Sequence, residues 1–308
     1  MALGYDGKLY ILAFDHRGSF QKKMFGIEGD PTPEETARIA DAKHLIYEGM
    51  AKAAESGSVA DDQVGVLVDE QFGGDVPQQA KGHGLKLAMP VEKSGQNEFD
   101  FQYGEAFGEH IERFDPAFSK VLVRYNPDDD ADMNRGQLER LKRLADWLHD
   151  NGRKFLFELL VPATDEQLAS VGGDTERYDA ELRPELMRRA IEEIQAFGCE
   201  VDIWKIEGVD AREDAETLAR QTRTGEGREN VVCVLLGRGA SDEKVDHWLR
   251  IAAPVDGFVG FAIGRSIWWD ALKGFLDGSI ERADAAQQIA ENYLRFIRVY
   301  EEQETAVA

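Results

Sequence analysis

The chain has few cysteines and few histidines. Its two cysteines, Cys199 and Cys233, lie beside or within apolar runs, which is typical of buried free thiols in a reducing compartment and excludes a disulfide scaffold. Of the six histidines, only His16 lies at the end of a predicted strand, and no two have the spacing of metal ligands. Asp69 and Glu70 lie at the end of the second predicted strand and could hold a metal ion, but without histidines they make a weak metal site. We therefore expect no metal ion and no other cofactor.

The sequence also lacks long apolar runs and an excess of basic residues. No stretch approaches 18 apolar residues, and the N-terminus has no basic segment followed by an apolar stretch and a cleavage site, so we expect no membrane span and no signal peptide. The 36 basic and 59 acidic residues give a net charge of -23, and such a surface repels nucleic acid and anionic membranes. These features predict a cytoplasmic protein whose partner is a small molecule, with a homo-oligomer left open.

Three common catalytic signatures are missing as well. The chain has no G-x-x-x-x-G-K-[ST] phosphate loop, no G-x-G-x-x-G turn after a strand, and no nucleophile elbow that would support a Ser/His/Asp triad.

What the chain does contain is eight short apolar runs rich in β-branched residues, with amphipathic stretches between them. Near-continuous runs of this kind are typical of parallel strands that are covered on both faces. The predicted strands cover residues 8–14, 63–69, 85–91, 120–125, 154–161, 201–206, 231–236 and 256–263. Eight strands alternating with helices favour a single (β/α)8 barrel over a doubly wound sheet, and 308 residues suit one such domain.

The intervals between these runs differ in their helical signal. Residues 33–56 have helical period and begin with a proline, and two further helices are predicted to stop at Gly152 and Gly198. The interval between the second and third strands is so short that its helix is short or absent. We expect residues 169–183 to form a loop inserted after the fifth strand, and residues 301–308 to be a frayed tail.

One charged residue stands out inside the apolar runs. Lys205 lies in VDIWKIEG near the end of the sixth predicted strand, next to Trp204 and Ile206. Because burying an unpaired ammonium is costly, such a lysine tends to lose its proton. A neutral amine can attack a ketone or aldehyde and form a Schiff base. The structural alternative is a lysine paired with Glu207 or another carboxylate.

Other charged residues follow or end predicted strands at the same, C-terminal side, where barrels of this class carry their active sites. If the alternating faces that hold these residues point inward, Asp15, Glu158 and Lys205 converge with a basic residue of the fourth strand, where Lys120 and Arg124 share one face. They would supply the amine, the acid/base carboxylates and the cations that Schiff-base aldol chemistry requires. Lys93 or Lys120 would also lower the pKa of Lys205 by like-charge repulsion.

Each of these residues also has a structural interpretation. Glu158 could form an ion pair with a lysine, Asp15 could cap the loop after the first strand, and Lys120 could be a solvated strand start. Charge placed at one end of four separate strands nevertheless favours a common site over four unrelated structural roles.

Glycine-rich turns, GRGAS and AIGRS, follow the last two strands, where barrels often bind phosphate. The residues concerned are Gly237, Gly239, Ser241, Gly264 and Arg265. Glycine lets the backbone approach an anion, N–H groups at a helix start bind it, and Arg265 adds a forked cation. Arg124 and Arg238 are the other candidate phosphate ligands. Ser241 also suits the N-cap of the following helix.

Five segments resemble a known enzyme family. They are AFDHRGSF, AMPVEKSG, FLFELLVP, VDIWKIEG and GFAIGRSIWW, and the similarity runs from about residue 8 to residue 300. Together they resemble the lysine-dependent class I aldolase barrels. The chain is similar to tagatose 1,6-bisphosphate aldolase and looks closest to the aldolase domain of myo-inositol catabolism, which cleaves 2-deoxy-5-keto-gluconate 6-phosphate.

The resemblance implies roles for six residues: Lys205 as the Schiff-base lysine, Glu158 as the proton shuttle, Asp15 as a substrate-contacting acid/base, Lys93 and Lys120 as assisting lysines, and Arg265 as the phosphate ligand. It implies a keto-sugar acid phosphate as substrate, with dihydroxyacetone phosphate and malonate semialdehyde as products. Two alternatives stay open: a tagatose-bisphosphate or sulfo-sugar phosphate aldolase on the same machinery, and a non-catalytic barrel that binds sugar phosphates.

Overall fold

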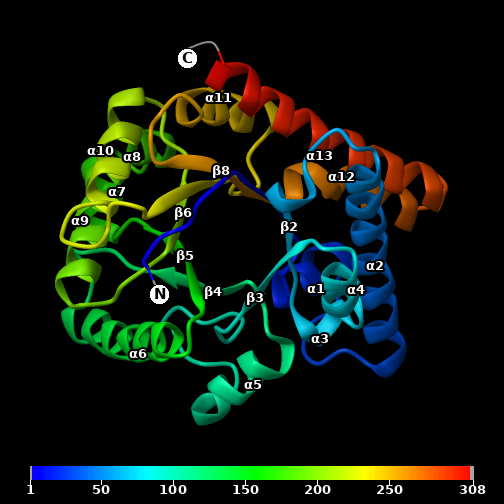
Figure 1. Cartoon of the computed structure of the whole chain (residues 1–308), viewed down its shortest axis with the longest axis horizontal. Helices are drawn as coiled ribbons and strands as arrows, with labels where there is room; N and C mark the ends of the chain where they lie inside the picture. The colour runs from blue at the N-terminus through cyan, green and yellow to red at the C-terminus, as the bar shows by residue number, and fades with distance from the viewer. Residues whose placement is uncertain (1, 306–308) are drawn as a thin grey trace.

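The computed structural model, which describes residues 2–305, is a closed barrel of eight parallel strands (Figure 1). Each strand pairs with its neighbours in sequence, and β8 pairs with β1 to close the barrel. The strands are β1 Leu9–Ala13, β2 Val64–Leu67, β3 Lys86–Pro90, β4 Phe118–Arg124, β5 Lys154–Leu160, β6 Ile203–Glu207, β7 Val232–Leu236 and β8 Phe258–Ile263. All eight predicted runs form strands, so the predicted (β/α)8 barrel is confirmed.

The α-helices form a layer around the barrel (Figure 1). They are α1 Gly18–Phe25, α2 Pro33–Glu55, α3 Glu70–Gly73, α4 Val76–Gly82, α5 Phe107–Phe114, α6 Ala131–Asp150, α7 Asp165–Ser170, α8 Thr175–Glu181, α9 Arg183–Ala196, α10 Arg212–Thr222, α11 Asp242–Ala252, α12 Arg265–Leu276 and α13 Arg282–Thr305. Short 3-10 turns lie at Asp61–Gln63 and Gly104–Ala106. The interval between β2 and β3 holds only the short α3 and α4, as its weak signal indicated. Within residues 2–305, no helix has the length and apolarity to cross a membrane.

Alternation along the strands divides the buried residues into two groups. One face of each strand packs against the helices. The other face forms a separate apolar cluster inside the barrel, made of Leu9, Ile11, Ala13, Leu67, Ala88, Phe118, Leu156, Ile203, Val232, Val234 and Ala262. Since side chains alternate with a period of two, the next inward positions toward the C-terminal strand ends are Asp15, Lys120, Glu158 and Lys205. An apolar plug therefore lies beneath a charged layer.

The segment after β5 differs from the expected loop. Residues 175–181, inside the 169–183 stretch, form helix α8. Asp174 caps this helix by accepting hydrogen bonds from its first backbone N–H groups. The buried Tyr178 donates its hydroxyl hydrogen to the carbonyl oxygen of Val161 at 2.9 Å. A cap and one buried aromatic anchor thus order a stretch whose polar, glycine-containing sequence indicated a loop.

The C-terminal region differs from the expected frayed tail. Helix α13 runs through residues 301–305, so the tail prediction is wrong for these residues, while residues 306–308 lie outside the described part of the chain. The Tyr10 hydroxyl donates to the Glu301 carboxylate at 3.3 Å, and Lys8 forms an ion pair with Glu304. These contacts tie the last turns of α13 to the start of β1. Elsewhere, Cys199 and Cys233 are buried free thiols, as predicted.

A buried carboxylate holds the N-terminal end of the barrel together. Asp202, just before β6, accepts hydrogen bonds from the backbone N–H groups of Gly4 (2.9 Å) and Phe155 (2.8 Å) and from the Lys154 ammonium (2.8 Å). The imidazole of His149 lies 3.0 Å from the same carboxylate. One side chain therefore joins the N-terminal segment, β5, α6 and β6.

Replacing Asp202 with Asn should lower the free energy of unfolding by about 2–4 kcal/mol at pH 7. The substitution removes the buried charge that pairs with Lys154 and weakens the hydrogen bonds from the two backbone N–H groups. Burial raises the pKa of Asp202, but His149, Lys154 and the Phe155 N–H outweigh it and hold the pKa below its ordinary value. A lowered folded-state pKa adds stability above the unfolded pKa of about 3.9, and that stability is lost as the pH falls through the folded value.

Urea unfolding followed by circular dichroism measures the free energy of unfolding of both proteins. The difference between wild type and Asp202→Asn should be constant from pH 7 to 5 and smaller below about pH 4. The exposed Asp61 provides the control, because Asp61→Asn should leave the unfolding curve unchanged. A gap that stays the same size at pH 3 would contradict the role given to the Asp202 charge.

Candidate functional site

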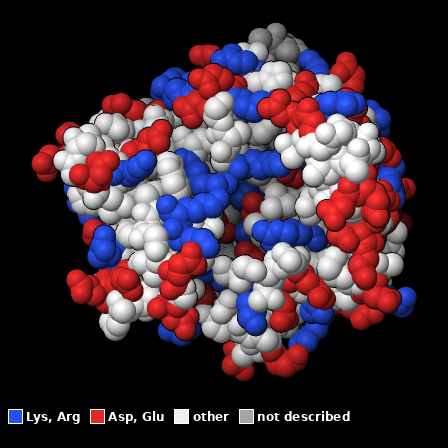
Figure 2. All heavy atoms as spheres, turned by 180° about the vertical axis from the view of Figure 1, so that it is seen from behind, with Lys and Arg blue, Asp and Glu red and all other residues white. Residues whose placement is uncertain are grey.

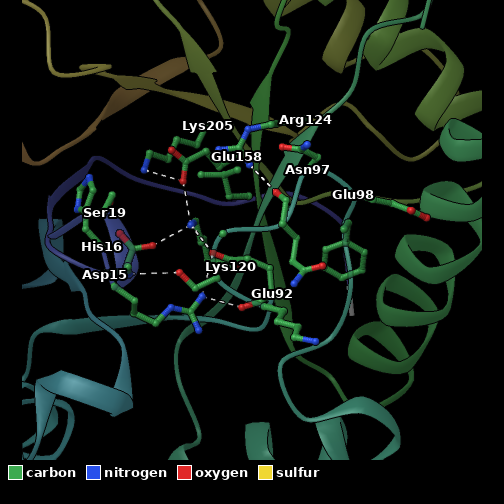
Figure 3. A pocket seen from close by; sticks show the side chains of 18 residues that line it. Asp15, His16, Ser19, Glu92, Asn97, Glu98, Lys120, Arg124, Glu158 and Lys205 are labelled. Carbon is green, nitrogen blue, oxygen red and sulfur yellow. Dashed lines mark hydrogen bonds and ion pairs between the residues drawn. The ribbon is translucent and has the colours of Figure 1, made fainter. Parts of the chain in front are cut away.

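A cluster of charged side chains fills the mouth of the barrel above the apolar plug (Figure 3). The Lys120 ammonium lies at its centre, 2.8 Å from Asp15 Oδ2, 2.9 Å from Glu92 Oε1 and 3.0 Å from Glu158 Oε2. The Lys205 ammonium lies 3.0 Å from the same Glu158 oxygen. The structure thus brings together Asp15, Glu158 and Lys205 as expected, and the basic residue of the fourth strand that joins them is Lys120.

Strand register places the two partners of the Lys205–Glu158 pair side by side. Glu158 on β5 is directly opposite Lys205 on β6, and both side chains continue the inward face of their strands. Lys120 and Lys205 are 1% and 4% exposed, so both residues are almost fully buried. Lys205 is therefore a paired lysine. Of the two alternatives that the sequence left open, the paired lysine is the one observed, and its partner is Glu158, whereas Glu207 pairs with Arg183 and Arg238.

Mutual attraction keeps the central groups charged despite burial. Burial raises the pKa of Glu158, but Lys120 and Lys205 outweigh it, so the pKa of Glu158 is lowered overall. The same balance lowers the pKa of Asp15. Burial lowers the pKa of Lys120, but Asp15, Glu158 and Glu92 raise it well above its usual range. At neutral pH the cluster therefore holds Lys120 as a cation and Asp15 and Glu158 as anions.

The third strand contributes Glu92 to this cluster instead of Lys93. Glu92 is buried, and the Arg17 guanidinium lies 3.6 Å from its carboxylate and donates to its backbone carbonyl at 2.6 Å. Burial raises the pKa of Glu92, although Lys120 and Arg17 act against this. Lys93 is exposed and lines only the outer part of the site, with no ion pair among residues 2–305. Sequence reasoning missed Arg17 and did not select Glu92, although alternation from Ala88 leads to Glu92.

His16 also faces the site without a partner. Its Nδ1 is buried and has no hydrogen bond among the described residues, and its ring packs edge-on against Trp268. Burial lowers the pKa of His16 to about 4, so the imidazole is neutral at pH 7. A neutral imidazole both donates and accepts hydrogen bonds, which makes His16 a candidate for substrate contact.

Two cavities meet at the Lys205–Glu158 pair. The first, here called the loop cavity, has a volume of about 240 Å³ and lies beside Asp15, Glu92 and the 93–99 loop. The second, the glycine cavity, has a volume of about 380 Å³ and is bounded by Lys23, the 237–239 turn and the start of α12. Both cavities are lined by His16, Leu122, Arg124, Glu158 and Lys205. A substrate attached to Lys205 can therefore extend in two directions.

The glycine cavity contains most of the predicted phosphate-binding residues: Gly237, Gly239, Gly264 and Arg265. Arg265 is the first residue of α12, whose first turn has no acidic residue and no side-chain cap among the described residues. The Arg265 guanidinium donates to the carbonyl of Arg238 at 2.8 Å and has no ion pair within residues 2–305. A part-buried guanidinium without a carboxylate, beside free N–H groups at a helix N-terminus, suits an anion.

Gly239 (φ 72°) approaches Arg265 so closely that a Cβ atom there would lie 2.5 Å from Cζ of the guanidinium. The two remaining predicted anion ligands, Ser241 and Arg124, lie in different places. Ser241 caps α11 by accepting a hydrogen bond from the Lys244 N–H at 3.3 Å, and it lies outside the glycine cavity. Arg124 lines both cavities, donates to the carbonyl of Gln96 at 2.9 Å, and has no ion pair in the described chain.

Positive and negative side chains are distributed unevenly over this surface. Figure 2 shows lysine and arginine side chains gathered around the hollow in the middle of one face, with acidic side chains spread around it. This local positive charge contrasts with the overall charge of -23. An anionic ligand is therefore attracted to the hollow although the molecule as a whole repels it. Among residues 2–305, no group of three or more His, Cys, Asp and Glu side chains is arranged to hold a metal ion.

Residues 5–304 match the family described as "Uncharacterized protein conserved in bacteria (DUF2090)", and the chain belongs to this family. A search of curated proteins gives no match. Two solved structures are similar in fold. A Corynebacterium glutamicum (Brevibacterium flavum) structural genomics target is 18% identical, with a TM-score of 0.59, over 95% of this chain and 88% of that chain. Fructose-bisphosphate aldolase from Plasmodium falciparum, solved with TRAP and a small-molecule inhibitor, is 16% identical, with a TM-score of 0.62, over 96% and 91%. The barrel is thus aldolase-like in fold.

Replacing Lys120 with Gln should destabilise the protein in a pH-dependent way. Without the ammonium, three buried carboxylates repel one another, and their folded-state pKa values rise above the unfolded ones. We expect a loss of about 3–5 kcal/mol in the free energy of unfolding at pH 7. The loss should shrink as the pH falls toward 5, because a carboxylate with a raised pKa takes up a proton on acidification and the repulsion ends.

Thermal and urea unfolding at pH 7 and pH 5 measure this effect. Lys93→Gln removes the same charge from the rim of the same cavity and should change the stability by less than about 0.5 kcal/mol. Equal losses in the two variants, or a Lys120→Gln loss that does not depend on pH, would show that Lys120 does not balance the carboxylates.

Proposed function

We propose that this member of the DUF2090 family is a class I aldolase that cleaves a phosphorylated keto-sugar acid through a Schiff base on Lys205. The observation that carries the proposal is the position of the buried Lys205–Glu158 pair at the junction of the two cavities. One direction from Lys205 leads to Arg265 and the start of α12, and the other leads to the 93–99 loop. This arrangement suits a substrate whose reactive carbonyl lies between two polar ends.

In the first half of the reaction, Lys205 forms the Schiff base with help from Glu158. The Lys205 ammonium transfers a proton to Glu158, 3.0 Å away, and the free amine attacks the ketone carbon. Glu158 then returns the proton to the hydroxyl of the carbinolamine, which leaves as water and yields the iminium. Lys120, 3.0 Å from the same carboxylate oxygen, holds Glu158 in place and remains a cation.

In the second half, the iminium draws electrons from the carbon–carbon bond that breaks. A carboxylate takes the proton from the hydroxyl on the carbon that becomes the aldehyde. The carbon–carbon bond then breaks, the aldehyde leaves, and the electron pair of the bond forms an enamine on Lys205. Protonation of the enamine and attack by water release the ketone product and regenerate the amine. We assign the hydroxyl proton to Asp15, which is buried, anionic and held 2.8 Å from Lys120.

Arg124 and Arg265 line the cavities without an ion pair among residues 2–305, and they support an anionic group at each end of the substrate. Arg265 and the start of α12 suit the phosphate, and Arg124 suits the acid group of the other product. This division favours cleavage of 2-deoxy-5-keto-gluconate 6-phosphate to dihydroxyacetone phosphate and malonate semialdehyde. A tagatose-bisphosphate or sulfo-sugar phosphate substrate is the alternative on the same residues. A barrel that only bound sugar phosphates would not require an amine beside Glu158.

Borohydride added with dihydroxyacetone phosphate should inactivate the enzyme and add mass to the peptide that contains Lys205, because reduction makes the imine permanent. Peptide mass spectrometry locates the adduct. Lys205→Ala should abolish trapping yet stay folded, since Glu158 keeps its contact with Lys120. Lys93→Gln should be trapped like wild type, and EDTA should have no effect on trapping or cleavage. Labelling of another lysine, or activity that EDTA abolishes and Zn²⁺ restores, would replace the proposed mechanism.

Replacing Arg265 with Ala should weaken the binding of phosphorylated substrate about 30-fold or more. A forked arginine–phosphate contact in a part-buried site contributes roughly 2–4 kcal/mol, and each 1.4 kcal/mol is about tenfold in affinity. Arg265→Lys should recover only part of this loss. Trapping of non-phosphorylated dihydroxyacetone should be almost unchanged, because Lys205 is intact. The measurement compares KM for the phosphorylated substrate with the trapping rate of dihydroxyacetone.

Arg124→Gln is the companion variant in this experiment. It should leave trapping of dihydroxyacetone phosphate almost unchanged and reduce condensation with malonate semialdehyde more than with acetaldehyde. If Arg265→Ala weakens phosphorylated and non-phosphorylated ligands equally, Arg265 has a structural role and the phosphate binds elsewhere. If Arg124→Gln affects both aldehydes equally, the acid group does not bind at Arg124.

A further inference from the structure

The turn after β7 holds Arg265 in place, but its own conformation requires support. Arg238 has a positive φ of 56°, which is unfavourable for a residue with a side chain. Its carbonyl oxygen accepts the hydrogen bond from Arg265, and Gly239 packs against the same guanidinium. Any rotation of the peptide after Arg238 would therefore move the acceptor that orients Arg265.

Two carboxylates fix the Arg238 side chain. Its Nη1 donates to Asp179 Oδ2 at 2.6 Å, and its Nε lies 3.1 Å from Glu207 Oε1. Asp179 lies on α8, the helix inserted after β5, whereas Glu207 ends β6. One guanidinium thus joins helix α8, the end of β6 and the turn after β7.

The buried Arg183 holds Asp179 in position. Arg183, 2% exposed, donates to Asp179 Oδ1 at 2.8 Å and to Glu207 Oε1 at 3.2 Å. The other oxygen of Glu207 accepts from the backbone N–H of Val161 at 3.0 Å, and Tyr178 bonds the carbonyl of Val161. Helix α8 is therefore attached to the ends of β5 and β6, and Asp179 presents its second oxygen to Arg238 from a fixed position.

We infer that Asp179 is a positioning residue for anion binding: through Arg238 it fixes the turn after β7, and through that turn it orients Arg265. This inference rests on the proposed phosphate site but not on the Schiff-base chemistry. Arg183 and Arg238 are balanced by Asp179 and Glu207, so the unpaired charge of Arg265 is left for the ligand. Helix α8, which has no place in the chemistry, thereby sets the affinity for the phosphorylated end of the substrate.

The inference predicts an effect of opposite sign to simple electrostatics. Asp179→Asn removes a negative charge near an anion site, so Coulomb attraction alone would tighten phosphate binding. If Asp179 positions Arg265, binding should instead weaken about tenfold, the effect of losing one charge-assisted hydrogen bond in the chain of contacts. Glu181→Gln is the charge-matched control, because Glu181 lies on the same helix and, among residues 2–305, forms an ion pair only with the exposed Arg177.

Isothermal titration with inorganic phosphate provides the main measurement. Asp179→Asn should bind phosphate about tenfold more weakly than wild type, whereas Glu181→Gln should bind equally well or slightly better. Asp179→Glu should restore part of the affinity. Arg238→Lys keeps the charge but loses the forked guanidinium that bridges two carboxylates. This variant should weaken phosphate binding as Asp179→Asn does. Trapping of non-phosphorylated dihydroxyacetone should stay within about twofold of wild type in all these variants, because binding in the glycine cavity is changed and the amine is not.

A double-mutant cycle with Arg265→Ala separates positioning from general destabilisation. In that background Asp179→Asn should cause no further loss of phosphate affinity, because the residue it orients is gone. Additive losses, or tighter phosphate binding by Asp179→Asn than by Glu181→Gln, would overturn the inference. If wild type traps no dihydroxyacetone at Lys205, the proposed aldolase function fails, while the phosphate titrations still decide the role of Asp179.

Discussion

The contact between one ammonium and three carboxylates is the constraint on which the mouth of the barrel depends. Inward-facing side chains of a closed barrel have little access to water, so each charge there needs a partner. Lys120 meets Asp15 and Glu92, which follow β1 and β3, and Glu158, which lies in β5. Removing any one charge would leave the others unbalanced. The cluster therefore fixes both the geometry of the strand ends and the protonation of the groups that meet a ligand.

Charge balance also separates the cations that hold the site together from those available to a ligand. Arg17, Arg183 and Arg238 lie against carboxylates. Arg124 and Arg265 have no ion pair within residues 2–305, although the whole chain carries a net charge of -23. In so acidic a protein, an arginine held by backbone carbonyls alone keeps its positive charge for an incoming anion. These two arginines of the cavities are thus more informative than the arginines that are paired with carboxylates.

Alternation explains why much of the fold and of the site could be predicted from sequence. Eight continuous apolar runs indicated eight strands, and a period of two within each run led to Asp15, Lys120, Glu158 and Lys205. The pairing of Lys205 with Glu158 depends on the register between two strands, which neither strand's own pattern encodes. The third strand ends at Pro90, so whether its next residues keep the alternation is decided by the loop, and Lys93 was predicted where Glu92 lies. Helix α8 depends on tertiary contacts of Tyr178 and Arg183 that local composition does not reveal.

The observed pairing changes the physical argument for a reactive lysine at position 205. A lysine without a partner would lose its proton through desolvation, whereas here a carboxylate lies ready to accept it. Lys120 and Lys205 lower the pKa of Glu158 overall, which makes the protonated form of Glu158 a stronger acid than an ordinary carboxyl group. Such an acid suits the dehydration of a carbinolamine, the step that needs a proton delivered to a leaving hydroxyl. An iminium carries the same single positive charge as the ammonium it replaces. The carboxylates around Lys120 and Lys205 therefore meet the same total charge before and after imine formation, and the cluster that stabilises the resting barrel also stabilises the covalent intermediate.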